Sequence, residues 1–169
     1  MKLFFKFLIL GVILASCSSD DDDNDIEPNV WDGITITEFV AENYPGEEPD
    51  ENGLYVIVTR EGSGDKAEEG DQLSVFYSGE LLDGTVFDSS HKRPEKDEDE
   101  EEEKEVNIFK FTLGKGEVIE GWDIGFDGLN YGTKAIFIIP AELGYGDTPR
   151  GSIPGGAPLL FEVELLNLR

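Results

Sequence analysis

Few residues of this chain have the types and spacing of a conventional catalytic centre. His91 is its only histidine and stands close to the acidic run Glu95–Glu105, so neither a Ser-His-Asp triad nor a histidine metal site is expected. Residues 114–116 read Gly-Lys-Gly and lack the hydroxyl residue that follows the lysine of a phosphate loop. The many carboxylates cannot be paired into a general acid and base from sequence alone. We therefore expect no metal, no cofactor and no covalent intermediate.

The residues that stand out instead are large and aromatic. Each lies at the end or on the face of an expected strand, or on the single expected helix. They could form part of an ordinary hydrophobic core, or they could line a binding site, and the residue types leave both alternatives open. The set comprises Tyr77, Phe87, Phe109, Trp122, Tyr145 and Phe161.

The helix that must position Trp122 is expected within residues 113–129. Apolar residues recur there at spacings of three and four, the period of one helical face. The same stretch holds three glycines, which are costly in a helix interior, so packing rather than propensity must hold it. We expect a sheet to wrap round this helix. The apolar positions are Ile119, Trp122, Phe126 and Leu129, and the glycines are Gly121, Gly125 and Gly128.

The rest of the chain has the pattern of strands and turns. Asp83-Gly84 is a hairpin signal between two strand-like stretches. The fold class is therefore predicted as α+β, an antiparallel sheet of about five strands wrapped round one short α-helix. The strand-like stretches are 54–60, 72–82, 85–87, 106–111, 133–140 and 159–168.

The N-terminus has the features of an export signal. Residues 1–16 combine a basic start with an apolar run that is too short to span a membrane. The sequence Leu14-Ala15-Ser16-Cys17 resembles the lipobox of bacterial lipoproteins, which implies acylation of Cys17, the chain's only cysteine, and anchoring to a membrane. The serine and aspartates that follow favour the outer membrane, at its periplasmic or cell-surface face. The alternative is an ordinary signal peptide with a stray cysteine.

The distribution of acidic residues divides the rest of the chain into a tether and a domain with an insertion. We expect residues 17–52 to be a lipidated acidic tether with one short ordered element, and residues 53–169 to be one domain with an acidic insertion at 91–105. The net charge is −25, and removing residues 1–16 would make it −27 because they contain two lysines and no acid. Such a chain repels nucleic acid, which is excluded as a partner. The like charges of 95–105 repel one another and favour a solvated loop.

Three segments carry a resemblance to a known family. They read VFYSGELLDGTVFDSS (75–90), FKFTLGKGEVIEGWDIGFDGLNYGTKAIFIIP (109–140) and LGYGD followed by IPGGAPLLFEVELLNL (143–147 and 153–168). Together they resemble FKBP-type peptidyl-prolyl cis–trans isomerases over about residues 53–168, in family order and interrupted by the acidic insertion. The resemblance implies a sheet round a short helix, with an apolar pocket between them.

The same resemblance implies roles for individual residues. Trp122 would form the pocket floor, Ile119 would offer its backbone N–H to the substrate carbonyl, and Tyr145 would offer its hydroxyl. Asp88 would hydrogen-bond the hydroxyl of Tyr77. The implied catalytic set is Tyr77, Asp88, Ile119, Trp122, Tyr145 and Phe161, and the implied substrate-binding set is Phe87, Phe109, Glu117 (through its backbone carbonyl), Val118 and Ile153.

The implied activity is isomerisation of X–Pro bonds in exported proteins. An apolar aromatic pocket would favour the twisted amide over the polar planar one. The expected partners are proline-containing unfolded or exported polypeptides, together with macrolide ligands of the FKBP class. Two alternatives stay open: a non-catalytic chaperone or binding module on the same fold, and a surface protein whose acidic loop binds a cation or a host partner.

Overall fold

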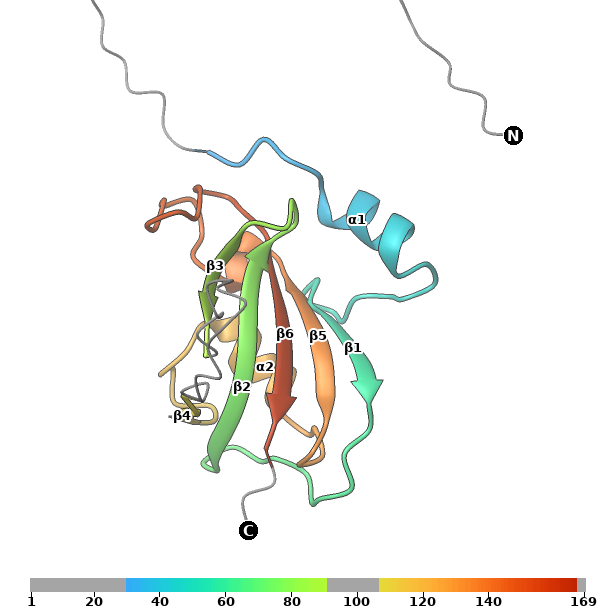
Figure 1. Ribbon diagram of the computed structural model, residues 1–169, viewed down its shortest axis with the longest axis vertical. Coiled ribbons are helices and arrows are strands. Elements are labelled where there is room, and N and C mark those ends of the chain that lie inside the picture. Colours follow the sequence, from blue (N-terminus) through green and yellow to red (C-terminus); the bar gives the residue numbers. More distant parts are fainter. Residues whose placement is uncertain (1–29, 91–106, 167–169) are drawn as a thin grey trace, which may run out of the picture.

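The computed structural model describes residues 30–90 and 107–166 (Figure 1). The predicted signal peptide, the predicted acylation site Cys17 and the acidic insertion 91–105 lie outside these residues. Among the described residues, no helix has the length and apolar character needed to cross a membrane.

The described residues form a six-stranded antiparallel sheet, which confirms the predicted fold class. The sheet has the order β1-β5-β6-β2-β3, and β4 also pairs with β2. The described residues form six strands, one for each strand-like stretch of the sequence, where the predicted fold class had about five. One edge of the long strand β2 pairs with two short strands, β4 near its start and β3 near its end. The strands are β1 Tyr55–Arg60, β2 Gln72–Leu81, β3 Val86–Ser89, β4 Phe109–Thr112, β5 Lys134–Ile139 and β6 Leu159–Leu165.

The predicted helix is present but shorter than the stretch 113–129. Helix α2 spans Glu120–Phe126 and lies against one face of the sheet (Figure 1). The residues before it form a turn, because Gly114 and Gly116 adopt positive φ and their N–H groups donate to the Asp123 carboxylate at 2.8 and 3.1 Å. A helix residue therefore closes the turn that precedes it.

Two glycines of α2 allow the helix to pack closely against the sheet, as expected from the low helix propensity of glycine. Gly121 and Gly125 are buried, and a Cβ atom on either would lie 2.5 Å from Ile139 or 2.8 Å from Phe137 of β5. Such distances are closer than real Cβ contacts, so only glycine lets the helix backbone approach the sheet this closely. Packing against β5 therefore replaces the missing helix propensity.

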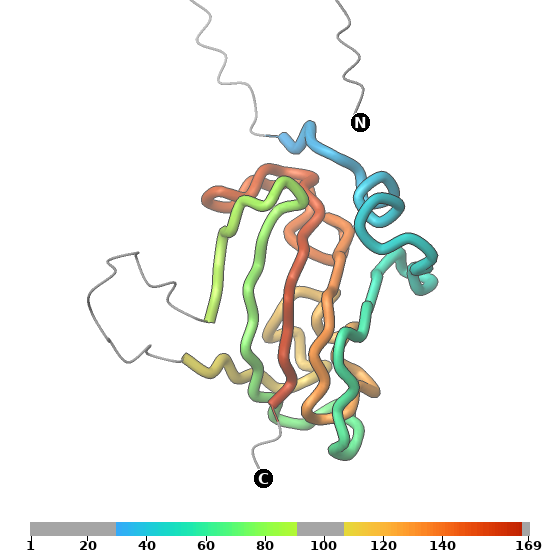
Figure 2. Tube along the Cα trace, turned by 45° about the vertical axis from the view of Figure 1, so that its right-hand side comes forward, coloured from blue at the N-terminus to red at the C-terminus, as the bar shows by residue number. Residues whose placement is uncertain are grey.

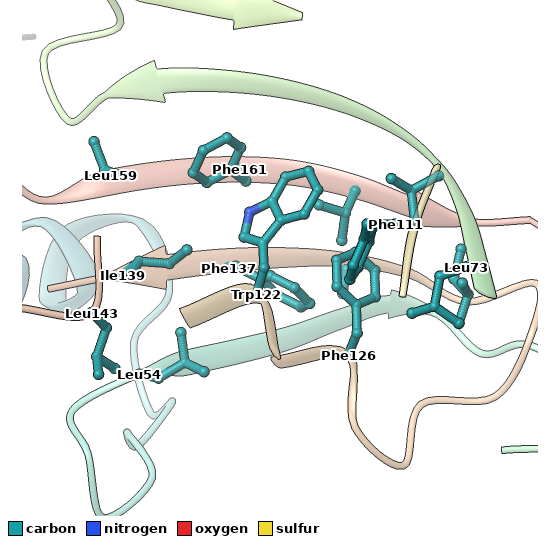
Figure 3. Close-up of a cluster of buried hydrophobic side chains, with 14 of the residues drawn as sticks. Leu54, Leu73, Phe111, Trp122, Phe126, Phe137, Ile139, Leu143, Leu159 and Phe161 are labelled. Atoms are coloured by element: carbon teal, nitrogen blue, oxygen red, sulfur yellow. The ribbon is translucent and has the colours of Figure 1, made fainter. Parts of the chain in front are cut away.

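The strands carry two apolar clusters on opposite faces of the sheet. In β5, Phe137 and Ile139 face α2, while Ile136 and Ile138 face the other side, as strand alternation requires. The inner cluster, on the α2 face, includes Leu73, Phe111, Trp122, Phe126, Phe137 and Phe161 (Figure 3). The outer cluster consists of Val40, Tyr55, Ile57, Leu82, Ile136, Ile138 and Leu160.

A second helix packs on the outer cluster. Helix α1 spans Ile36–Asn43, and its Val40 is buried there. Thr35 and Glu38 form a capping box at its start, so the short ordered element expected in the tether is a helix that begins at a Thr-x-x-Glu signal. The acidic tether was expected to run to residue 52, and the structure places the part from Val30 onward against the domain. A 3-10 turn, Ala141–Leu143, follows β5.

Candidate active site

A cavity of about 520 Å³ opens between the start of α2, strands β2, β3, β4 and β6, and the loop that follows residue 143. This volume lies within the range of small-ligand pockets, about 300–1,000 Å³. Its lining comprises Tyr77, Asp88, Phe109, Glu117, Val118, Ile119, Glu120, Trp122, Gly144, Tyr145, Arg150 and Phe161.

Trp122 occupies the centre of this lining. Its side chain rises from α2 among the inner-cluster rings, and only 4% of the residue is exposed (Figure 3). The rings of Tyr77, Phe109 and Phe161 meet it nearly edge-on, with centroid distances of 5.2, 5.8 and 5.2 Å. Edge-to-face contacts of this kind hold an aromatic ring in a defined orientation. Trp122 therefore presents a fixed apolar surface to the cavity.

The indole N–H of Trp122 is buried without a hydrogen-bond partner in the described part of the chain. A buried donor left unpaired costs about 1–3 kcal/mol. Hydrogen bonding to a protein acceptor therefore does not account for tryptophan at this position, whereas the large flat face of the ring does.

The Asp-Ser-Ser sequence at the end of β3 fixes Tyr77 at both ends. The Tyr77 backbone N–H donates to the Ser90 hydroxyl at 2.9 Å, and the Ser89 hydroxyl donates to the Tyr77 carbonyl at 3.1 Å. The Tyr77 phenol donates to the Asp88 carboxylate at 2.8 Å, the contact that the resemblance implied. Burial, followed by this hydrogen bond, raises the pKa of Tyr77 well above its ordinary value. The phenol therefore stays protonated and keeps donating.

Phe87 supports the pocket from behind. It does not line the cavity, and its ring packs edge-on against that of Phe161 at 5.5 Å. Both rings crowd the position of Gly79 in β2, where a Cβ atom would lie 2.7 Å from each. A glycine at this place in the strand makes room for the two rings, and their contact holds Phe161 toward the cavity.

The residues just before α2 bring backbone groups to the cavity. Ile119 is the N-cap of α2, and within the described residues its N–H has no hydrogen-bond acceptor. The Glu117 carboxylate accepts a hydrogen bond from the Thr112 N–H at 2.8 Å, which joins this turn to β4. The turn is thus held in place while the Ile119 N–H is left available to a bound molecule.

The loop 144–158 forms the opposite rim. Tyr145 lines the cavity, and its hydroxyl makes no hydrogen bond to another described residue. The Arg150 guanidinium lies 4.9 Å from the centre of the Tyr145 ring, a cation–π distance. Ile153 is not among the lining residues of the cavity; it is buried in the inner cluster.

The structure thus brings nine of the eleven predicted protein-site residues to one cavity, and places Phe87 and Ile153 behind it. Sequence reasoning missed Glu120, Gly144 and Arg150 as lining residues. No sequence pattern marks Arg150 as a lining residue, because its position over the Tyr145 ring depends on the fold of the loop. The apolar floor and the two rim donors, the Ile119 N–H and the Tyr145 hydroxyl, can hold an apolar ring with an adjoining carbonyl.

Comparison with known proteins gives a consistent result. Residues 64–166 match the family model described as FKBP-type peptidyl-prolyl cis-trans isomerase. FK506-binding protein 2B of Rhizopus delemar is 47% identical over 106 residues, which cover 62% of this chain and 45% of that protein. The FK506-binding protein of Neisseria meningitidis serogroup B is 42% identical over 117 residues, which cover 69% of this chain and 96% of that protein.

A solved structure shares the fold. The crystal structure of FkpA from Escherichia coli superposes with a TM-score of 0.62 at 32% identity, covering 78% of this chain and 54% of that one. The present chain therefore corresponds to about half of FkpA, and to less than half of the Rhizopus protein.

Proposed function

Because the chain belongs to the FKBP-type peptidyl-prolyl cis-trans isomerase family, we propose that it catalyses the cis–trans isomerisation of X–Pro peptide bonds. The observation that carries this proposal is the aromatic floor at Trp122, with the Ile119 N–H and the Tyr145 hydroxyl at the rim; neither donor has an acceptor among the described residues. A proline ring fits such a floor, and the adjoining carbonyl fits the donors.

The chemistry demands little beyond this surface. Rotation about a peptide bond meets a barrier of roughly 18–20 kcal/mol because the planar amide is stabilised by resonance. In the twisted amide this resonance is lost, and the carbonyl is less polarised than in the planar form. An apolar pocket therefore disfavours the polar ground state relative to the twisted one, and complementarity to the twisted shape adds to the effect.

The lining residues have distinct roles in this reaction. Trp122, Tyr77, Phe109 and Phe161 exclude water and hold the proline ring, while the Ile119 N–H and the Tyr145 hydroxyl orient substrate carbonyls. The Tyr77 phenol donates a hydrogen bond to the Asp88 carboxylate, which stabilises the charge of this lining residue beside the aromatic rings. Bond rotation then proceeds with no proton transfer and no covalent bond to the protein.

A protease-coupled assay on a peptide with a Leu-Pro bond tests the proposal. We expect the purified chain to accelerate isomerisation, Trp122→Leu to lose more than about tenfold in kcat/KM, and Tyr145→Phe to lose a smaller factor. Val58→Ala, an exposed change on β1, is the control. Absence of any acceleration by the folded wild-type chain would refute the isomerase function and favour the non-catalytic binding module.

The cavity is also proposed to bind a second class of ligand. Because two relatives are named FK506-binding proteins, we propose that macrolides of this class compete with proline peptides for the cavity. Inhibition of the peptide assay by FK506, weakened in Trp122→Leu, is the expected result. Peptide activity that FK506 leaves unchanged would separate the two ligand classes.

We also propose that the protein is exported and lipid-anchored to the outer membrane through Cys17, where it acts on unfolded exported polypeptides. The support is the sequence Leu14-Ala15-Ser16-Cys17 and the acidic residues that follow it. Cys17→Ala should move the protein from the membrane fraction to the soluble fraction of fractionated cells. Retention of this variant on the membrane would contradict the anchor.

A further inference from the structure

The loop 144–158 is closed on itself by contacts among its own residues. Arg150 and Ile153 exchange two backbone hydrogen bonds at 2.8 and 3.0 Å, and the Gly156 N–H donates to the Gly146 carbonyl at 2.9 Å. A Cβ atom on Gly155 would collide with the Asp147 backbone. The two limbs of the loop are therefore in contact, and a displacement of residue 155 is passed directly to the limb that carries Tyr145.

The N-terminal segment joins this loop at Gly155. The Trp31 N–H donates to the Gly155 carbonyl at 2.9 Å, and Val30 and Gly155 form a parallel β-bridge. Figures 1 and 2 both show the start of the described chain, in blue, running beside the orange-red loop. Gly155 thus lies between Asp147 on one side and the N-terminal segment on the other.

The side chain of Trp31 secures this junction. It packs against both the inner and the outer cluster, so it wraps the edge between the two faces of the sheet. Its indole N–H donates to the Ile34 carbonyl at 3.3 Å, and a Cβ atom on Gly33 would collide with its ring. The indole is therefore held by its own segment in the position from which it contacts the domain.

Helix α1 anchors the other end of the segment. Val40 is 4% exposed in the outer cluster, and Ile36 and Phe39 pack against the same cluster. The segment is therefore attached at two places, the sheet face under α1 and the carbonyl of Gly155.

We propose that residues 30–34, which precede α1, act as a clamp that holds the pocket-rim loop in its binding position, with Trp31 as the positioning residue. This inference rests on the proposed function for its effect on substrates. A loop that is ordered before binding loses less conformational freedom when substrate arrives, so the clamp raises affinity for proline peptides. Trp31 is not among the residues that line the cavity. Its side chain holds the segment whose backbone N–H contacts Gly155, and Gly155 in turn contacts Asp147 on the limb that carries Tyr145.

The test compares two aromatic truncations in the same segment. Trp31→Ala removes the side chain at the junction, and Trp31→Phe restores part of it. Phe39→Ala removes a half-buried ring from α1 and leaves the contact at Gly155 intact. Each variant is made in the whole chain, and its fold is checked by far-UV circular dichroism and thermal unfolding.

Two measurements are made on each variant. In Trp31→Ala we expect KM for the proline peptide to rise by about threefold to tenfold, with kcat within about twofold of wild type. Amide hydrogen exchange should speed up in 144–158 and not in β1 or α2. Trp31→Phe should recover most of both effects, and Phe39→Ala should show little of either.

The outcomes separate the clamp from general stability and from the isomerase proposal. Faster exchange spread equally over the loop, β1 and α2, or equal effects of Trp31→Ala and Phe39→Ala, would overturn the clamp. If Trp31→Ala fails to fold, Trp31→Leu is judged by the same exchange pattern. If the wild-type chain has no isomerase activity, the exchange data still decide whether Trp31 holds the loop.

Discussion

The two α-helices of this domain are stabilised in opposite ways. Helix α1 has a side-chain capping box and no glycine, and it buries a single residue, Val40. Helix α2 has no side-chain cap and contains Gly121 and Gly125, yet it buries four of its seven residues. Neither is long enough to be stable alone in water. The contrast shows that α2, which carries Trp122, is stabilised mainly by packing against the sheet. Helix α1 is stabilised in part by the capping box in its own sequence.

This difference has a functional reason. Trp122 must lie at a fixed depth below the cavity, and the glycines allow α2 to approach β5 closely enough to place it there. A helix designed for local stability would carry alanines at these positions and would stand farther from the sheet. Helix α1 has no such constraint, because it covers the outer cluster without contributing to the cavity.

The largest expected difference between the helices comes from truncating one aromatic ring in each. Phe126 of α2 is fully buried and touches the rings of Phe137, Trp122 and Phe111 at 4.9–5.6 Å. We expect Phe126→Ala to lower the free energy of unfolding by about 3–5 kcal/mol. Phe39→Ala, which removes a half-buried ring from α1, should cost clearly less, as measured by urea unfolding. Equal losses would show that the two helices depend equally on packing.

Replacing a glycine of α2 by alanine, and an alanine of α1 by glycine, separates packing from helix propensity in the two helices. Gly125→Ala adds about 1 kcal/mol of helix propensity but forces a methyl group against Phe137, and overpacking costs about 1–3 kcal/mol. We expect a net loss of stability. On α1, Ala41→Gly at an exposed position should lose about 1 kcal/mol of local helix stability through propensity alone. A gain in unfolding free energy for Gly125→Ala would contradict close packing of α2.

Removing the cap of α1 should have a smaller, local effect. The Thr35 hydroxyl accepts a hydrogen bond from the Glu38 N–H at 3.3 Å. Thr35→Ala should cost about 1 kcal/mol of helix stability. Faster amide exchange in α1, with an almost unchanged urea midpoint, is the expected signature. Thr37→Ala, at an exposed position inside α1, is the matched control; because alanine is the better helix former, it should not speed exchange in α1. A loss of exchange protection in α2 would show that the two helices are coupled.

The smallest effect is a pH dependence confined to α1. Hydrogen bonds from the Thr35 hydroxyl and N–H lower the pKa of Glu38. Because its folded-state pKa lies below the unfolded value of about 4.3, this contribution is complete above that pH. It is lost as the pH falls through the lowered folded-state pKa. The protection of α1 amides, taken relative to the intrinsic exchange rate at each pH, should fall on acidification, and Glu38→Gln should remove this dependence. An identical pH response in wild type and Glu38→Gln would exclude Glu38 as its source.

Much of the domain could be predicted from local sequence patterns. Strand alternation in 72–82 and 159–168 specified which side chains face the core, and the spacing of Trp122 and Phe126 specified a helix. These patterns are local because neighbouring residues alternate or repeat with the period of the backbone. The resemblance then identified nine of the twelve residues that line the cavity.

The remaining features depend on contacts between residues far apart in the chain. Three contacts depend on the tertiary fold and correspond to no periodic pattern in the sequence: Gly125 against Phe137, Phe87 against Phe161, and Arg150 over the Tyr145 ring. The contact between Trp31 and Gly155 is of the same kind, since it joins two segments that neither share a strand nor repeat a motif. The sequence alone determined the sheet and the helix; the tertiary structure decided which segments hold the pocket in place, because packing at that distance depends on the whole fold.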